Sequence, residues 1–187
     1  MNDAPGPNAA GLFAAHVDVG SWARFTPTLA TLLDHGHRPE SPWPAPPEGS
    51  ATGRGPGATG APGNGPTVLL TAPAPVVAQN SPITPRGLGR LLHRRRAPSP
   101  EPPAIMLTIR RHDVEAVLPV LDPVGRVILD QEACGALAAL GWTTEAGRMH
   151  RVFPDGQRAA QMVAQVLIEV LRVPHPADLS IAAPPRG

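Results

Sequence analysis

His175 is the first of the few residues in this sequence that could take part in chemistry. It stands between two prolines in the stretch from Val166 to Ser180, VLIEVLRVPHPADLS. Pro174 cannot continue a helix, and it biases Val173 toward extended dihedral angles. Asp178 is the one other ligand type nearby, and a single imidazole with one carboxylate makes a poor metal site. We therefore interpret Pro-His-Pro as the end of a helix and expect no metal site there.

Three other patterns suggest chemistry, and each has a simpler explanation. His35 and His37 have His-x-His spacing, but they stand between a helix end and a proline-rich linker, where we expect solvated side chains. Cys134 falls in a helical pattern, which favours a structural thiol over a nucleophile. The stretch GAPGNGPT, residues 60–67, has Pro66 where a phosphate loop needs lysine. No Gly-x-Ser-x-Gly motif is present. We therefore expect no enzyme, no catalytic residue, no cofactor and no metal.

One cluster of positive charge stands out, GRLLHRRR at residues 89–96. Its arginines, Arg90, Arg94, Arg95 and Arg96, carry planar guanidinium groups that suit phosphate. The net charge of the chain is only +1, so no global field attracts nucleic acid. We expect a solvated or partner-docking cluster. The alternative is an adaptor that contacts nucleic acid or an anionic surface, whose binding would weaken steeply with salt.

Composition divides the chain into two unequal parts. Residues 1–103 hold 19 of the 26 prolines and 13 of the 19 glycines. Such a segment has too few large apolar side chains to offset its ordering entropy. The sequence therefore predicts a low-complexity, mostly disordered arm over residues 1–103, with short helices at 21–34 and 87–96. A folded domain is expected over residues 104–183.

The compartment follows from cysteine usage and hydropathy. A single cysteine excludes an internal disulfide and fits a reducing environment. No apolar stretch approaches the roughly 20 residues that span a bilayer, and the start of the chain lacks the features of a signal peptide. We expect a cytoplasmic protein without membrane contact.

From residue 104 the pattern predicts four strands. Residues 105–110 and 114–121 alternate loosely and form an antiparallel pair, in which Pro119 marks an edge or a strand end. Residues 142–153 form a hairpin that turns at Glu145–Gly147.

Two helices complete the predicted domain. The first is capped by Asp130 and stops at Gly141. The second covers residues 156–172 and is capped by Asp155. Its aliphatic side chains form one continuous stripe, which indicates a core-facing helix: Ala159, Met162, Val163, Val166, Leu167, Val170 and Leu171. The predicted fold is thus α+β, a small antiparallel sheet flanked by helices in the order β-β-α-β-β-α.

Three phrases of the C-terminal half occur in the order and spacing of one family. ALAALGW (136–142), RMHRVFP (148–154) and VLIEVLRVPHPADL (166–179) resemble the type III secretion chaperone-like and YbjN-like domains, or TY-Chap, common in actinobacterial proteins. The family fold is α-β-β-β-α-β-β-α. The resemblance implies an opening helix in SWARFTPTLATLL and a first strand in TVLLT. Whether residues 21–34 and 67–71 complete the domain stays open at this point.

The resemblance also implies a function without an active site. Members bind polypeptide through a sheet-and-helix surface, often as dimers, in a chaperone-like or regulatory role. We expect a non-enzymatic protein that binds a polypeptide client or partner protein, as a homodimer or a monomer, and we do not expect nucleic acid as the partner. Trp142, Phe153 and Ile168 are candidate contacts beside the arginine cluster. For the two aromatics the favoured alternative is an ordinary core position.

Overall fold

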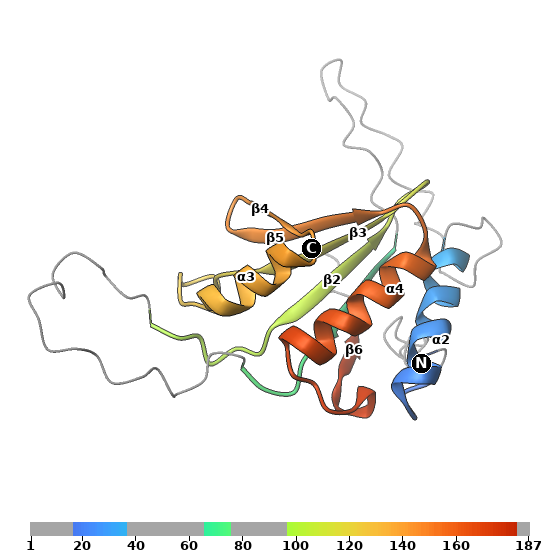
Figure 1. Ribbon diagram of the computed structural model, residues 1–187, viewed down its shortest axis with the longest axis horizontal. Helices are drawn as coiled ribbons and strands as arrows, with labels where there is room; N and C mark the ends of the chain where they lie inside the picture. Colours follow the sequence, from blue (N-terminus) through green and yellow to red (C-terminus); the bar gives the residue numbers. More distant parts are fainter. Residues whose placement is uncertain (1–16, 37–65, 76–96, 183–187) are drawn as a thin grey trace, which may run out of the picture.

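The computed structural model describes residues 17–36, 66–75 and 97–182, which form an α+β fold (Figure 1). The order β-β-α-β-β-α predicted from residue 104 is confirmed, and one further strand follows it. The described elements in chain order are α2 (Trp22–His35), β1 (Thr67–Thr71), β2 (Ala104–Ile109), β3 (Val114–Pro119), α3 (Gln131–Ala139), β4 (Thr143–Glu145), β5 (Arg148–Phe153), α4 (Gly156–Gln165), the π-helical turn η2 (Val166–Val170), the 3-10 turn η3 (Pro176–Asp178) and β6 (Ser180–Ala182).

The strands form one antiparallel sheet in the order β4-β5-β3-β2-β1-β6. Pro119 ends β3, as the sequence predicts, but β3 lies inside the sheet between β5 and β2 and is not an edge. Strand β1 lies between β2 and β6, with Leu70 opposite both Ile105 and Ile181. The segment 67–71 therefore joins the C-terminal strand to the rest of the sheet.

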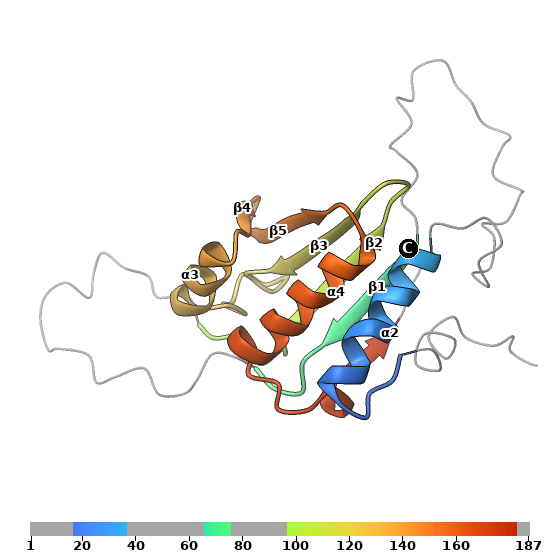
Figure 2. The ribbon, with the colours of Figure 1, turned by 45° about the vertical axis from the view of Figure 1, so that its right-hand side comes forward.

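The three helices pack on one face of the sheet (Figures 1 and 2). The strand residues under them are the apolar side chains that alternate inward, such as Val68, Leu107 and Ala116, all fully buried. Helices α2 and α4 run antiparallel and are joined at both ends. Near one end the Gly156 N–H donates to Asp34 Oδ1 at 2.8 Å. Near the other, Trp22 Nε1 donates to the carbonyl of Pro174 at 3.3 Å.

Helix α2 belongs to this core. Its side chains Phe25, Leu29 and Leu33 recur every fourth residue and are completely buried. Pro27 lies inside the helix and removes one backbone hydrogen bond. Burial of the three large side chains, each about 1.5–3 kcal/mol before entropy is subtracted, exceeds that penalty of roughly 3 kcal/mol. The folded unit thus takes in α2 and β1, which lie before residue 104, where the sequence predicts the domain to begin. The helix predicted at 87–96 lies outside the described residues.

The last helix begins as predicted but ends differently. Asp155 caps it by accepting a hydrogen bond from the Arg158 N–H at 2.7 Å. After α4 the backbone widens into the π-helical turn η2, in which the Leu171 N–H donates to the Val166 carbonyl at 2.9 Å. Arg172 then takes a left-handed conformation with φ of 55°. Glycine is the usual residue at such a position, so Arg172 gives no signal for the left-handed turn, although Pro174 signals that the helix ends nearby.

Candidate functional site

The two aromatic side chains proposed as contacts lie in the core. Trp142 and Phe153 are each 3% exposed, and their rings meet edge to face with centroids 6.4 Å apart. The Arg151 guanidinium lies over the Phe153 ring at 5.2 Å and donates to the Leu140 carbonyl. A partner could touch either ring only if this cluster opened. The packing satisfies the apolar surface of both rings, while the Trp142 Nε1–H is buried without a hydrogen-bond partner among the described residues.

Ile168 does lie on the surface. It is 41% exposed and stands on η2, which continues α4. The remaining candidates, Arg90, Arg94, Arg95 and Arg96, lie outside the described residues. Among the residues proposed from the sequence, the structure therefore places Ile168 alone on a described surface.

The face of the sheet opposite the helices carries no described helix (Figure 2). We call it the open sheet face. One apolar row crosses three of its strands, formed by Leu69, Met106 and Val117, which pair in register. Leu69 and Met106 are half-buried and Val117 is 8% exposed. Eight side chains from the four strands β1, β2, β3 and β5 define this face: Thr67, Leu69, Met106, Thr108, Glu115, Val117, His150 and Val152.

The outer edge of β5 adds a second feature to the open sheet face. Strand β4 pairs with β5 only from Arg148 to His150. In an antiparallel sheet, the N–H and C=O groups of one residue both point toward the same neighbouring strand, and those of the residue two positions later point toward that strand as well. Val152, two residues after His150, therefore directs both groups toward the side where no described strand continues. Its side chain is 43% exposed. An unpaired edge beside an exposed aliphatic side chain can accept an extended segment.

Polar side chains border the apolar row. Glu115 lies on the open sheet face, where Arg110 donates to one carboxylate oxygen and His150 Nε2 lies 3.0 Å from the other. The group holds β2, β3 and β5 in register from outside. Because both oxygens already have partners, Glu115 is a weak candidate for a base or a ligand.

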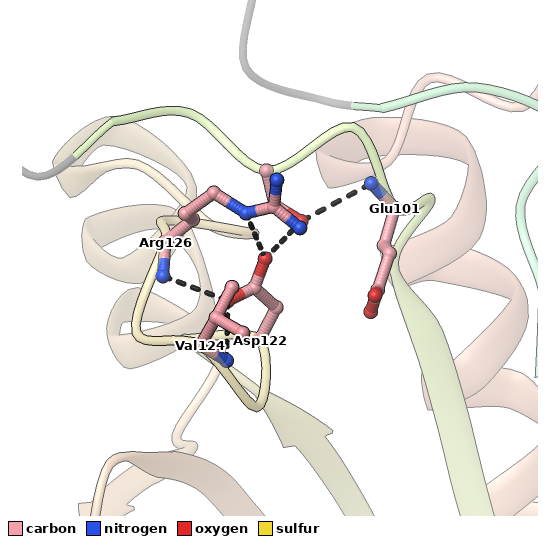
Figure 3. Close-up of polar contacts among 5 residues, drawn as sticks. Glu101, Asp122, Val124 and Arg126 are labelled. Atoms are coloured by element: carbon pink, nitrogen blue, oxygen red, sulfur yellow. Dashed lines mark hydrogen bonds and ion pairs between the residues drawn. The ribbon is translucent and has the colours of Figure 1, made fainter.

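A second polar cluster lies at the loop between β3 and α3 (Figure 3). The Asp122 side chain is buried and accepts four hydrogen bonds, from the N–H groups of Val124 and Arg126, from Arg126 Nε at 2.6 Å and from Ser99 Oγ at 2.8 Å. Burial alone would raise the pKa of Asp122, but the hydrogen bonds from Arg126 and Ser99 lower it to about 2. Every lone pair is used, so this carboxylate fixes the loop and leaves no position for a ligand.

The other residues with chemical potential are also explained by structure. His175 Nδ1 accepts a hydrogen bond from the Ala177 N–H at 3.1 Å and so caps η3, which fits the interpretation of Pro-His-Pro as a helix end. Burial and the charge of Asp130 raise the pKa of the Cys134 thiol, which disfavours the reactive thiolate. His35 Nδ1 lies 2.8 Å from the Thr31 carbonyl, and His37 lies outside the described residues.

The described ranges offer neither a metal-binding cluster nor a membrane-spanning helix. Residues 17–36, 66–75 and 97–182 contain no group of three or more His, Cys, Asp or Glu side chains that could hold a metal ion. None of the helices in these ranges is both long enough and apolar enough to cross a membrane.

Comparison with known families gives one match. The family model of TY-Chap3, described as the T3SS (YopN, CesT) and YbjN peptide-binding chaperone 3, matches residues 92–185, just over half of the chain. The chain belongs to this family. No curated protein and no solved structure matches the chain.

The TY-Chap3 segment is smaller than the folded unit. It begins after α2 and β1, yet among the described strands β6, which lies inside it, pairs with β1 alone. The sequence resemblance is thus confirmed for the C-terminal half. The structure adds α2 and β1, which pack against that half and complete the sheet and the helix layer.

The sequence does not predict the open sheet face as a binding surface, and the reason is physical. Its apolar members Leu69, Met106 and Val117 stand in strands whose inward residues are also apolar, so alternation is weak there. Val152 in β5 is the one residue whose type indicates an exposed apolar position, because it follows the polar residues His150 and Arg151.

Proposed function

We propose that the protein is a non-enzymatic TY-Chap3 protein of the cytoplasm that binds a polypeptide segment through its open sheet face, in a chaperone-like or regulatory role. The family description supports peptide as the ligand class. The observation that carries the choice of surface is the apolar row Leu69–Met106–Val117 on the face opposite the helices. The row reaches His150 on β5, and the exposed Val152 is the next residue of that strand on the same face.

The chemistry of this face suits an extended apolar segment. A strand added along the outer edge of β5 would gain backbone hydrogen bonds from Val152. Its alternate side chains would lie on the same side of the sheet as the open sheet face, next to Val152, which is 43% exposed. Burying one aliphatic side chain contributes about 1.5–3 kcal/mol, so a few such contacts support binding of moderate affinity.

Two matched variants test the surface. Val152 and Ile168 are aliphatic and exposed to 43% and 41%, but one lies on the open sheet face and the other on the helix layer. We expect Val152→Asp to weaken binding to an immobilised array of unstructured peptides about tenfold or more, because the charge cannot be buried against an apolar segment. Ile168→Asp should leave the affinity unchanged.

Each outcome has a distinct meaning. If Ile168→Asp weakens binding and Val152→Asp does not, the contact lies on the helix layer, as the sequence suggested for Ile168, and the assignment to the open sheet face is wrong. Binding that falls steeply with salt while both variants behave like the parent would favour the adaptor function of the Arg90–Arg96 cluster.

The same edge bears on the oligomeric state. Strand β5 of a second copy could occupy the position beyond Val152, so the homodimer expected from the family resemblance stays a prediction. Light scattering during size-exclusion chromatography measures it directly. A mass that halves in Val152→Asp would show that copies meet at this edge.

A further inference from the structure

The outer surface of the helix layer contains a hollow that is separate from the open sheet face. It has a volume of about 360 Å³ and lies between α2 and α4. Because the two helices run antiparallel, residues near the C-terminal end of α2 meet residues near the N-terminal end of α4. Seven side chains line the hollow: Thr26, Pro27, Ala30, Thr31, Asp34, Gln157 and Gln161.

Hydrogen-bond acceptors from both helices line the hollow. Asp34 is exposed, and its Oδ1 is held in place by the Gly156 N–H at 2.8 Å. Within the described residues no arginine or histidine lies within ion-pair distance of this carboxylate. Gln157 and Gln161 stand one turn apart on α4, and neither side-chain amide has a partner in the described part of the chain. Thr31 Oγ1 donates to the Pro27 carbonyl and keeps lone pairs free.

The hollow also contains apolar surface from α2. Pro27 is exposed there, and Ala30 is 9% exposed and forms part of the floor. None of the described residues that line the hollow is basic. An apolar floor that leads to a carboxylate and amide carbonyls matches the arginine side chain, whose methylene stem packs on apolar surface and whose planar head donates five hydrogen bonds.

We propose that this hollow binds an arginine side chain of a partner polypeptide, with the guanidinium group on Asp34, Gln157 and Gln161 and the stem on Pro27 and Ala30. This site lies on the opposite side of the sheet from the surface proposed above and does not depend on it. A metal ion fits less well, because the hollow offers only one carboxylate. One carboxylate surrounded by neutral acceptors suits a single guanidinium group, which donates several hydrogen bonds in one plane.

The test uses the full chain and a matched pair of probes. The tripeptide Ac-Ala-Arg-Ala-NH2 carries the guanidinium group, and the same peptide with citrulline has the same shape without the charge. We expect the arginine probe to shift the backbone amide NMR signals of Thr31, Gln157 and Gln161 in a saturable way, and the citrulline probe to shift them far less.

Two substitutions sharpen the test. Asp34→Asn keeps a carbonyl oxygen for the Gly156 N–H but removes the charge, so it should leave the thermal midpoint near that of the parent and weaken binding of the arginine probe about tenfold or more. Gln161→Glu adds a second carboxylate to the lip of the hollow and should strengthen binding. Val152→Asp, on the open sheet face, should change neither result.

Three results would overturn the proposal. Equal shifts with arginine and citrulline would show that the charge is not recognised. Shifts that persist unchanged in Asp34→Asn would place the probe elsewhere. Self-association of the parent that disappears in Asp34→Asn would assign the hollow to an arginine of a second copy in place of a separate partner.

Discussion

Gly156, the first residue of α4, offers the sharpest test of the packing between α2 and α4. A Cβ atom added at this residue would lie 2.6 Å from Asp34 Oδ1, 2.8 Å from the Ala30 carbonyl oxygen and 2.8 Å from Leu33 Cβ. Ordinary contacts of a Cβ atom begin near 3.4 Å. Two of these neighbours belong to the backbone or the base of a side chain, so they cannot rotate away. Gly156→Ala must therefore push α2 outward.

The magnitude follows from two opposing effects. Overpacking at a rigid contact costs about 1–3 kcal/mol, and the shift also stretches the hydrogen bond from Gly156 to Asp34, which contributes about 1 kcal/mol. The lower entropy of alanine in the unfolded chain returns only about 0.4–1 kcal/mol. We expect Gly156→Ala to lower the free energy of unfolding by about 1–3 kcal/mol in urea denaturation followed by tryptophan fluorescence.

Gly135 in α3 supplies the matched control. A Cβ atom there would meet nothing within 4 Å, and the residue is exposed inside a helix. Gly135→Ala should therefore raise the free energy of unfolding by about 0.4–1 kcal/mol. The two variants make the same chemical change and should move stability in opposite directions. A Gly156→Ala protein as stable as the Gly135→Ala protein would refute the close approach of α2 to α4.

The remaining predictions concern backbone strain and acid stability. Arg172 has φ of 55° and Ala146, in the hairpin turn, has φ of 46°. Arg172→Gly and Ala146→Asn should each raise the free energy of unfolding by up to about 1 kcal/mol in the same urea assay. Ala138→Gly in α3 should lower it by about 1 kcal/mol. The pKa of Asp122 is about 2 in the folded chain, below its ordinary value of 3.8, so its ionised form stabilises the fold fully above the ordinary value. That stabilisation is lost as the pH falls from about 4 toward 2, so the decline of the urea midpoint over this window should be shallower in Asp122→Asn than in the parent.

Local signals explain what the sequence predicts well. Asp130 and Asp155 each accept a hydrogen bond from the N–H three residues later, as N-caps do. Gly141, at φ 81°, follows the end of α3, and Ala146-Gly147 makes the turn of the hairpin. Each of these features depends on residues within one turn of each other, so their types alone indicate the structure.

Contacts between distant segments explain the rest. The residue types at 67–71 do not indicate that this strand lies between β2 and β6, because both partner strands come from segments far along the chain. Trp142 and Phe153 illustrate the same limit. The sequence favours a core position for both without excluding a binding surface, and only the packing around them shows that they are buried. The open sheet face and the hollow are likewise products of assembly.

The position of β1 also sets the order in which the molecule can mature during synthesis. Leu69 pairs with Ala182, 182 − 69 = 113 positions later. Until the ribosome has released β6, β1 has only β2 for a neighbour, and its outer edge is open to other nascent chains. Closing so wide a loop is slow compared with forming the β2–β3 hairpin. A protein of a chaperone family would thus itself pass through a vulnerable interval, during which its own unfinished sheet needs protection.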